Sequence, residues 1–366
     1  MSDEFQILLT VPKIVRKDGR SHSTIKKEYF TKPNLVSYMK DDYGKCTKGQ
    51  AMRYLQLSTA VYPLDLCEGY DVHKFRKSFM YKKYLELVLE WAMSAEGRQH
   101  VQKNIDKTLI FIRRGALAKI MMSPLMPCKE FNNWVLFVSR YNNNLYMCLD
   151  EQDESTAEKT LSMYHHTRLD HLLFSEGQRL RPDTSKPTDD NIRYSVVHTS
   201  SMGKYNFIYS GEVQGIKADE DIKDLSDLSS LNACEYVMTK QLWETMAYNL
   251  KFMKYLSWWL HAYLANCRSI YVARKDSNGV VQEPIQYIKV SSIPKDYNFD
   301  PGFLIGFLHN FLEMVESLMS NIDSHETVYE FRFNSFDKTI RYRIHSGNRS
   351  KIFISADYIK YCRSCV

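Results

Sequence analysis

Hydrophobic positions follow two kinds of spacing along the chain. Apolar residues three and four positions apart predict helices over 78–93, 157–174, 303–319 and a long amphipathic segment that ends at Leu264. Short runs rich in β-branched and aromatic residues predict strands at 5–11, 108–115, 133–138, 144–149, 193–214 and 234–238, on both sides of the turn at 276–279, and between 328 and 354. The balance of the two patterns predicts an α+β fold with mixed β-sheets flanked by helices.

The domain organisation depends on one segment. Residues 175–191 contain two prolines and mixed charge, which predicts a surface loop. This loop is the best candidate for a domain boundary, but strands are predicted on both sides of it and no linker-like composition appears. We therefore expect a single domain over residues 1–366.

Composition sets only loose limits on function. The 366 residues are 44% hydrophobic and 25% charged, as in ordinary globular proteins. Forty-nine Lys and Arg against 43 Asp and Glu leave a formal charge of +6, which permits a polyanionic partner without requiring one. The apolar run at 303–319 is interrupted by His309, Glu313 and Glu316, so it predicts a core helix, and no membrane partner is expected.

The eight cysteines are scattered, and the chain begins with a polar, acidic segment that does not resemble a secretory leader. We therefore expect reduced thiols. Cys362 and Cys365 have CxxC spacing, but a zinc site needs four ligands and no second pair is present. The sequence predicts no zinc site here.

Five positions are expected to form one patch. Glu212 and Gln214 have equal parity on a predicted strand, so they share a face, and Glu235 and Val237 do the same on the next strand. If the two strands pair, the following helix can place His261 over the edge of the patch. The alternative is that both glutamates are only solvent-facing strand residues.

Several motifs, taken in order, resemble the decapping exonuclease (DXO/Rai) family, whose enzymes act on RNA 5′ ends. Residues 111–119 are similar to the family's F-x-x-W-R-G-x-L-T-K, with Arg114 at the arginine. Residues 194–199, 209–214 and 254–261 resemble Y-S-V-V-R-T, F-x-G-E-x-D and K-L-L-K-W-W-A-Q. The resemblance covers most of the chain after residue 60 and implies the family fold, with 1–60 as a divergent N-terminal part. It also implies that Arg114 contacts RNA phosphate.

The chain departs from the family at the positions that carry chemistry. A glutamate is changed to Asp170, an aspartate to Gln214, a lysine to Val237 and a glutamine to His261. Phosphodiester hydrolysis by divalent metal ions needs several carboxylates and a cation near the scissile phosphate. We therefore expect a degenerate pocket without a metal ion or catalysis.

This pattern of loss resembles a noncatalytic germline member of the family that is associated with transcription of piRNA source loci. The resemblance implies a nuclear pseudoenzyme, without a cofactor, that binds or shields RNA 5′ ends and joins protein partners in a chromatin-associated complex. Two alternatives stay open. An active decapping enzyme or 5′–3′ exoribonuclease would hold Mg²⁺ or Mn²⁺ on Asp170, Glu212 and Glu235. A protein-interaction module would bind no RNA.

Overall fold

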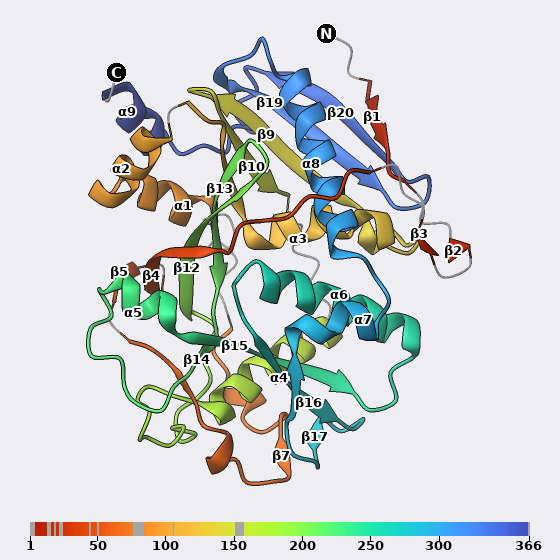
Figure 1. Cartoon of the computed structure of the whole chain (residues 1–366). Coiled ribbons are helices and arrows are strands. Elements are labelled where there is room, and N and C mark those ends of the chain that lie inside the picture. The colour runs from red at the N-terminus through yellow and green to blue at the C-terminus, as the bar shows by residue number, and fades with distance from the viewer. Residues whose placement is uncertain are drawn as a thin grey trace.

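The computed structural model describes residues 4–12, 16–17, 20–21, 25–43, 45–49, 51–75, 84–104, 106–150 and 157–364. Within these ranges the fold consists of two mixed β-sheets with helices packed between and around them (Figure 1).

The larger sheet contains ten strands among the described residues, in the order β1-β20-β19-β9-β10-β8-β13-β12-β4-β5. In chain order they are β1 (Gln6–Thr10), β4 (Asn34–Asp42), β5 (Lys45–Lys48), β8 (Leu109–Arg113), β9 (Trp134–Tyr141), β10 (Asn144–Leu149), β12 (Ile192–Met202), β13 (Tyr205–Glu212), β19 (Ser324–Asn334) and β20 (Thr339–Ser346). Strand β8 runs parallel to both its neighbours, β10 and β13, whereas the other pairs are antiparallel.

The smaller sheet has the order β11-β6-β14-β15-β16-β18. Its strands are β6 (Tyr54–Leu55), β11 (Phe174–Ser175), β14 (Gly215–Lys217), β15 (Glu235–Trp243), β16 (Ser269–Lys275) and β18 (Gln286–Lys289). Two short ribbons pair β7 (Leu64–Asp65) with β17 (Val280–Val281) and β2 (Arg16–Lys17) with β3 (Arg20–Ser21).

The helices are α1 (Tyr84–Met93), α2 (Ala95–Lys103), α3 (Arg114–Met122), α4 (Ala157–Leu173), α5 (Leu228–Ala233), α6 (Tyr248–Tyr263), α7 (Ile293–Asp296), α8 (Pro301–Leu318) and α9 (Ala356–Ser364). The main hydrophobic core joins buried residues of α3, α6 and α8 to the inner faces of both sheets. Helices α1 and α9 cover the opposite face of the larger sheet, and α4 covers the outer face of the smaller one (Figure 1).

The predicted α+β class is confirmed. Helices α4 and α8 match the predicted 157–174 and 303–319 within two residues, and β1 lies at a sheet edge. The helix predicted over 78–93 is seen as α1, while its residues 78–83 lie outside the described ranges. Most of 175–191 forms the predicted loop. Among the described residues, no helix is long and apolar enough to span a membrane.

Three sequence predictions were wrong in detail. The strand at 108–115 ends at Arg113, and Arg114 begins α3. The strand predicted to reach Gln214 ends at Glu212, after which the chain crosses to the smaller sheet. The last predicted strand region ends at Ser346 rather than at residue 354, and α9 follows it.

Candidate functional site

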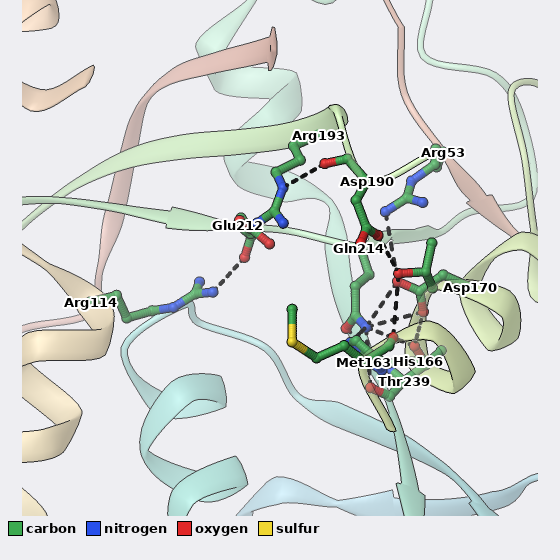
Figure 2. Close-up of polar contacts among 11 residues, drawn as sticks. Arg53, Arg114, Met163, His166, Asp170, Asp190, Arg193, Glu212, Gln214 and Thr239 are labelled. Carbon is green, nitrogen blue, oxygen red and sulfur yellow. Dashed lines mark hydrogen bonds and ion pairs between the residues drawn. The ribbon is translucent and has the colours of Figure 1, made fainter. Parts of the chain in front are cut away.

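The site lies where the chain passes from one sheet to the other. Strand β13 ends at Glu212 in the larger sheet and β14 begins at Gly215 in the smaller sheet, so Val213 and Gln214 connect the two. The start of α3, the middle of α4, and β15 bring side chains to this crossing (Figure 2). Residues from segments that are far apart in the sequence therefore converge on Val213 and Gln214.

The side-chain amide of Gln214 lies at the centre of this cluster. Its Nε2 lies 3.1 and 3.2 Å from the two carboxylate oxygens of Asp170, 2.8 Å from the Thr239 hydroxyl, 3.1 Å from the Thr239 carbonyl and 3.1 Å from Nε2 of His166. The amide oxygen accepts a hydrogen bond from the backbone N–H of Thr239 at 2.9 Å, which fixes the orientation of the amide. Five acceptor atoms thus surround an NH₂ group that has only two hydrogens.

Asp170 is fully engaged by these contacts. The Thr239 hydroxyl also donates to its carboxylate, and the guanidinium of Arg53 lies 4.0 Å away. Arg53 is held against the rings of Tyr194 and Phe174, at 4.6 and 5.2 Å from the ring centroids. The Asp170 carboxylate therefore has hydrogen-bond donors from the protein and one nearby cation.

Arg114, the first residue of α3, lies on the other side of Glu212 from Gln214 (Figure 2). Its guanidinium donates to the backbone carbonyl of Glu212 and is buried, and burial lowers its pKa. Its Nε and Nη1 have no acceptor among the described residues. Gly211 makes room for this side chain, because a Cβ at that position would lie 2.7 Å from Cζ of Arg114.

The carboxylate of Glu212 turns toward Arg193 and forms an ion pair with it. Glu212 and Gln214 were predicted to project together, but they make different contacts, because β13 ends between them and the backbone turns toward the other sheet. Glu212 still acts electrostatically on His166, Lys240 and Arg114, so it belongs to the same cluster.

Glu235 and Val237 do not join this cluster, so their predicted place in the patch was wrong. The Glu235 carboxylate accepts a hydrogen bond from Ser269 at 2.7 Å. Val237 is 1% exposed and packs in the hydrophobic cluster that includes Leu169. The cause is the strand register. Strand β14 pairs its first residue, Gly215, with Val237 of β15, and the preceding Gln214 bonds to Thr239, two residues further along β15.

Lys240 was missed. It lies on the face of β15 opposite to Thr239, and its electrostatic neighbours are Asp170, Arg114, Cys267 and Glu212. Lys240 therefore brings a positive charge within electrostatic range of Arg114, from the face of β15 opposite to that of Val237 and Thr239. The sequence contained a signal for it, because Tyr236, Met238 and Leu242 form an apolar alternation that Lys240 alone interrupts.

His261, on α6, lies within electrostatic range of Arg114 and Lys240. Burial, followed by these cations, lowers its pKa to about 3, so its imidazole is neutral at physiological pH. Burial also lowers the pKa of His166. Neither histidine therefore adds positive charge to the cluster.

The residues at the site do not fit a divalent metal ion. Mg²⁺ and Mn²⁺ prefer several hard oxygen ligands, usually with more than one carboxylate. Here Asp170 is bound by Gln214 and Thr239, and Glu212 is paired with Arg193. Among the described residues, no group of three or more His, Cys, Asp and Glu side chains is arranged to hold a metal.

The family of the chain follows from the match of residues 32–359 to the model of the RAI1-like PD-(D/E)XK nucleases. The chain belongs to this family. It is 23% identical to the decapping and exoribonuclease protein Rai1 of Drosophila melanogaster over 65% of this chain and 64% of that protein. It is 22% identical to the protein cutoff of the same species over 75% of this chain and 71% of cutoff.

Solved structures of family members share the fold. Rai1 of Scheffersomyces stipitis, in complex with (3′-NADP)⁺ and calcium, superposes with a TM-score of 0.73 at 15% identity, covering 94% of this chain and all of that one. Rai1 of Candida albicans, in complex with pU5–Mn²⁺, has a TM-score of 0.73 at 13% identity over 93% of this chain and 98% of that one. The fold assigned by the sequence resemblance is confirmed.

Proposed function

We propose that this chain is a noncatalytic member of the RAI1-like family that binds RNA 5′ ends. The observation that carries the proposal is the position of Gln214, whose neutral amide, rather than a metal ion, satisfies Asp170 in the middle of the site. The chain has the family fold and a buried arginine, but it lacks the set of carboxylate ligands that metal-dependent hydrolysis needs.

The argument against turnover is electrostatic. Metal-assisted hydrolysis uses the ion both to generate the attacking hydroxide and to stabilise developing charge. Removing one preorganised group from such a site typically costs about 2.7–4 kcal/mol of transition-state stabilisation. Here Gln214 is neutral, and Glu235 is held by Ser269 away from Asp170. The alternative of an active enzyme, with a metal on Asp170, Glu212 and Glu235, lacks one of its three ligands.

The argument for RNA 5′ ends rests on the positive groups that remain. Arg114 is buried with two N–H groups that have no acceptor among the described residues, and Lys240 interacts electrostatically with Arg114. The planar guanidinium of arginine and the ammonium of lysine are the groups that proteins commonly use to donate hydrogen bonds to phosphate. A solved relative contains pU5, a 5′-phosphorylated oligonucleotide, which supports the same class of ligand here.

The finer role follows from the similarity to cutoff. A family member without turnover that retains RNA-end binding would shield nascent transcripts and bring protein partners to chromatin. We therefore extend the proposal to a nuclear scaffold in piRNA-source transcription in the germline. The interaction module without RNA binding is the competing function, and RNA binding separates the two.

The test is an activity assay on the purified chain. RNAs with a 5′-monophosphate, a 5′-triphosphate or an unmethylated cap are incubated in Mg²⁺ and in Mn²⁺, beside an Asp170→Ala/Glu212→Ala control. We expect RNA binding that weakens with salt and no cleavage. Cleavage that disappears in the double variant would show that the chain is an enzyme, and absence of binding would favour the interaction module.

A further inference from the structure

The larger sheet has a second concave site, at the end of β13 away from the crossing. This cavity has a volume of about 200 Å³. Asn206 in its wall and Glu212 at the crossing are six positions apart on β13, so the two sites are separated by roughly 20 Å. The groups that matter for a ligand belong to Thr31, Lys32, His100, Lys107, Ser201 and Asn206.

Hydrogen bonds hold the wall of this cavity in place. The backbone N–H of Thr31 donates to the carbonyl of Ser201 at 2.8 Å, and the N–H of Ser201 donates to the Thr31 hydroxyl at 2.8 Å. The Ser200 hydroxyl donates to the carbonyl of Thr31 at 2.7 Å. The segment before β4 is thus bound to the end of β12. A ligand entering the cavity would meet a wall that is already ordered, which lowers the entropic cost of binding.

Asn206 has a donor that the protein does not use. The side chain is 8% exposed, and its amide oxygen accepts a hydrogen bond from the Ser201 hydroxyl at 2.6 Å. The amide nitrogen has no acceptor among the described residues. A buried NH₂ group is rarely left unpaired, because it loses its hydrogen bonds to water without replacement. An oxygen acceptor from a ligand is what this amide lacks.

The charged side chains in the described part of the cavity wall are all positive. Lys32 and Lys107 line the cavity, and no Asp or Glu lines it within the described ranges. Both lysines are exposed, and neither forms an ion pair with a residue that the structure describes. Ammonium groups donate strong, charge-assisted hydrogen bonds to phosphate oxygens. The pair therefore favours an anionic ligand with several oxygen atoms.

The end of α2, which also lines the cavity, is compatible with such a ligand. The last carbonyls of a helix carry partial negative charge and disfavour an anion. Here the carbonyl of His100 accepts from the Asn104 side chain at 2.8 Å, and those of Val101 and Gln102 accept from the Asn104 N–H. Burial, followed by Lys103, lowers the pKa of His100, so its neutral imidazole can accept a hydrogen bond from a hydroxyl.

Size and chemistry together narrow the class of ligand. The volume of about 200 Å³ is smaller than the roughly 300–1,000 Å³ of sites for drug-sized ligands. Phe207 lines the cavity but is fully buried, so the wall offers no exposed Phe, Tyr or Trp among the described residues on which a nucleobase could stack. Lysines, amides and an imidazole acceptor instead suit a phosphate attached to a group that has several hydroxyls.

We propose that this cavity binds a sugar phosphate, with Lys32 and Lys107 on the phosphate and with Asn206 and His100 on the oxygens of the sugar. The inference goes beyond the proposed function and does not depend on it, because the crossing between the sheets takes no part. The same chemical unit occurs as a free pentose phosphate and, repeated, as the backbone of RNA. The two sources are separated by experiment.

Isothermal titration calorimetry of the full chain compares ribose 5-phosphate, inorganic phosphate and ribose. We expect ribose 5-phosphate to bind about 10-fold or more tightly than either fragment, because a single charge-assisted hydrogen bond contributes about that much. Equal affinities for ribose 5-phosphate and phosphate would reduce the cavity to an anion site and overturn the proposal. Equal affinities for ribose 5-phosphate and ribose would overturn it as well.

Variants connect the binding to the cavity. Lys32→Met/Lys107→Met is expected to weaken binding of ribose 5-phosphate about 10-fold or more, since two charge-assisted contacts are lost. Lys289→Met/Lys295→Met is the matched control, because it removes the same charge from exposed lysines outside the cavity. An affinity that survives the cavity variant, or that falls equally in the control, would contradict the proposal.

Asn206→Asp tests the buried amide separately. The change keeps an oxygen that can accept from Ser201 and replaces the unused NH₂ group by negative charge, so it is expected to abolish binding of ribose 5-phosphate. Unchanged binding would overturn the role given to Asn206. Thermal unfolding verifies that each variant is folded. If Asn206→Asp is not folded, the lysine pair still decides, because both lysines are exposed.

An RNA with a 5′-hydroxyl, labelled at its 3′ end, distinguishes the two sources of the ligand. Fluorescence anisotropy that is weakened by Lys32→Met/Lys107→Met and not by the control would support the proposal with the RNA backbone as the source. Equal RNA affinities in the parent and this variant, beside a loss of ribose 5-phosphate binding, would support it with a free sugar phosphate. Binding of RNA 5′ ends that persists in the cavity variant, with no binding of ribose 5-phosphate to the parent, would overturn this inference and leave the proposed function standing.

Discussion

The amide nitrogen of Gln214 lies 3.1 and 3.2 Å from the two carboxylate oxygens of Asp170. An NH₂ group donates hydrogen bonds but brings no net charge. The contact therefore satisfies Asp170 without a cation, and it ties the segment between the two sheets to α4. The local structure depends on residue 214 being a neutral donor.

Gln214→Asp is expected to lower the free energy of unfolding by roughly 1–3 kcal/mol in EDTA, because a donor is lost and a second carboxylate faces Asp170. Mn²⁺ is expected to restore part of this loss, since paired carboxylates attract a hard cation and its binding stabilises the folded state. Thermal unfolding with and without Mn²⁺ measures both effects. Gln214→Ala, which adds no carboxylate, should not respond to the metal. A Gln214→Asp chain as stable as the parent in EDTA would contradict the role given to the amide.

Lys240→Met is expected to stabilise the chain, because it removes a positive charge from a buried position. Lowering the pKa of Lys240 from 10.5 to about 8 reflects the cost of burying its charge. On the scale of 1.36 kcal/mol per pKa unit, the gain is on the order of 3 kcal/mol at pH 7. Urea unfolding measures it. If the lysine stem contributed mainly by packing, the variant would instead be less stable than the parent.

The same lysine gives a pH dependence with a defined sign. Between pH 8 and 10.5 the unfolded chain holds the Lys240 proton and the folded chain has released it, so stability rises with pH across this window. Below pH 8 the lysine is protonated in both states and the full cost is present. Lys275, whose pKa burial also lowers to about 8, contributes in the same direction. The difference in stability between the parent and Lys240→Met isolates residue 240, and it should shrink from pH 8 to 10.5.

The sequence predicted the long elements because their patterns are strong. Helix α8 is apolar and buried along most of its length. Asn142 and Asn143 adopt the left-handed backbone expected of the hairpin between β9 and β10. Helix α3 was read as the end of a strand. It is buried on almost every side, so it shows no amphipathic period, and Gly115 looked like a strand terminator.

The site was only partly predictable for a different reason. Asp170, Gln214 and Arg114 could be placed from the family motifs, because each lies in a segment with a fixed position in the fold. Residue choice on β15 depended on strand register, which a single sequence specifies poorly. The register instead brings Thr239 to Gln214, and the sequence motifs did not point to this residue.

Gly211→Ala is expected to displace Arg114, because the new methyl group would lie 2.7 Å from the guanidinium carbon. We expect a loss of stability of about 1–3 kcal/mol from the overpacked site and weaker RNA binding. Thermal unfolding and RNA anisotropy measure the two effects. Gly115→Ala is the matched control, since no atom lies within 4 Å of its added Cβ and the position is helical. It should be neutral or stabilising by up to about 1 kcal/mol.

Val237→Lys tests the register of β15 directly. If residue 237 occupied the lysine position of the family site, this change would restore a charge among Asp170 and Glu212. The structure instead buries Val237 at 1% exposure beside Leu169, so an ammonium there has no partner. We expect the free energy of unfolding to fall by more than about 3 kcal/mol, with no gain in RNA binding. Val237→Ala, which only opens a cavity, should cost less, about 1–3 kcal/mol. Urea unfolding of both variants decides the matter, because a lysine tolerated as well as alanine would place residue 237 at the site after all.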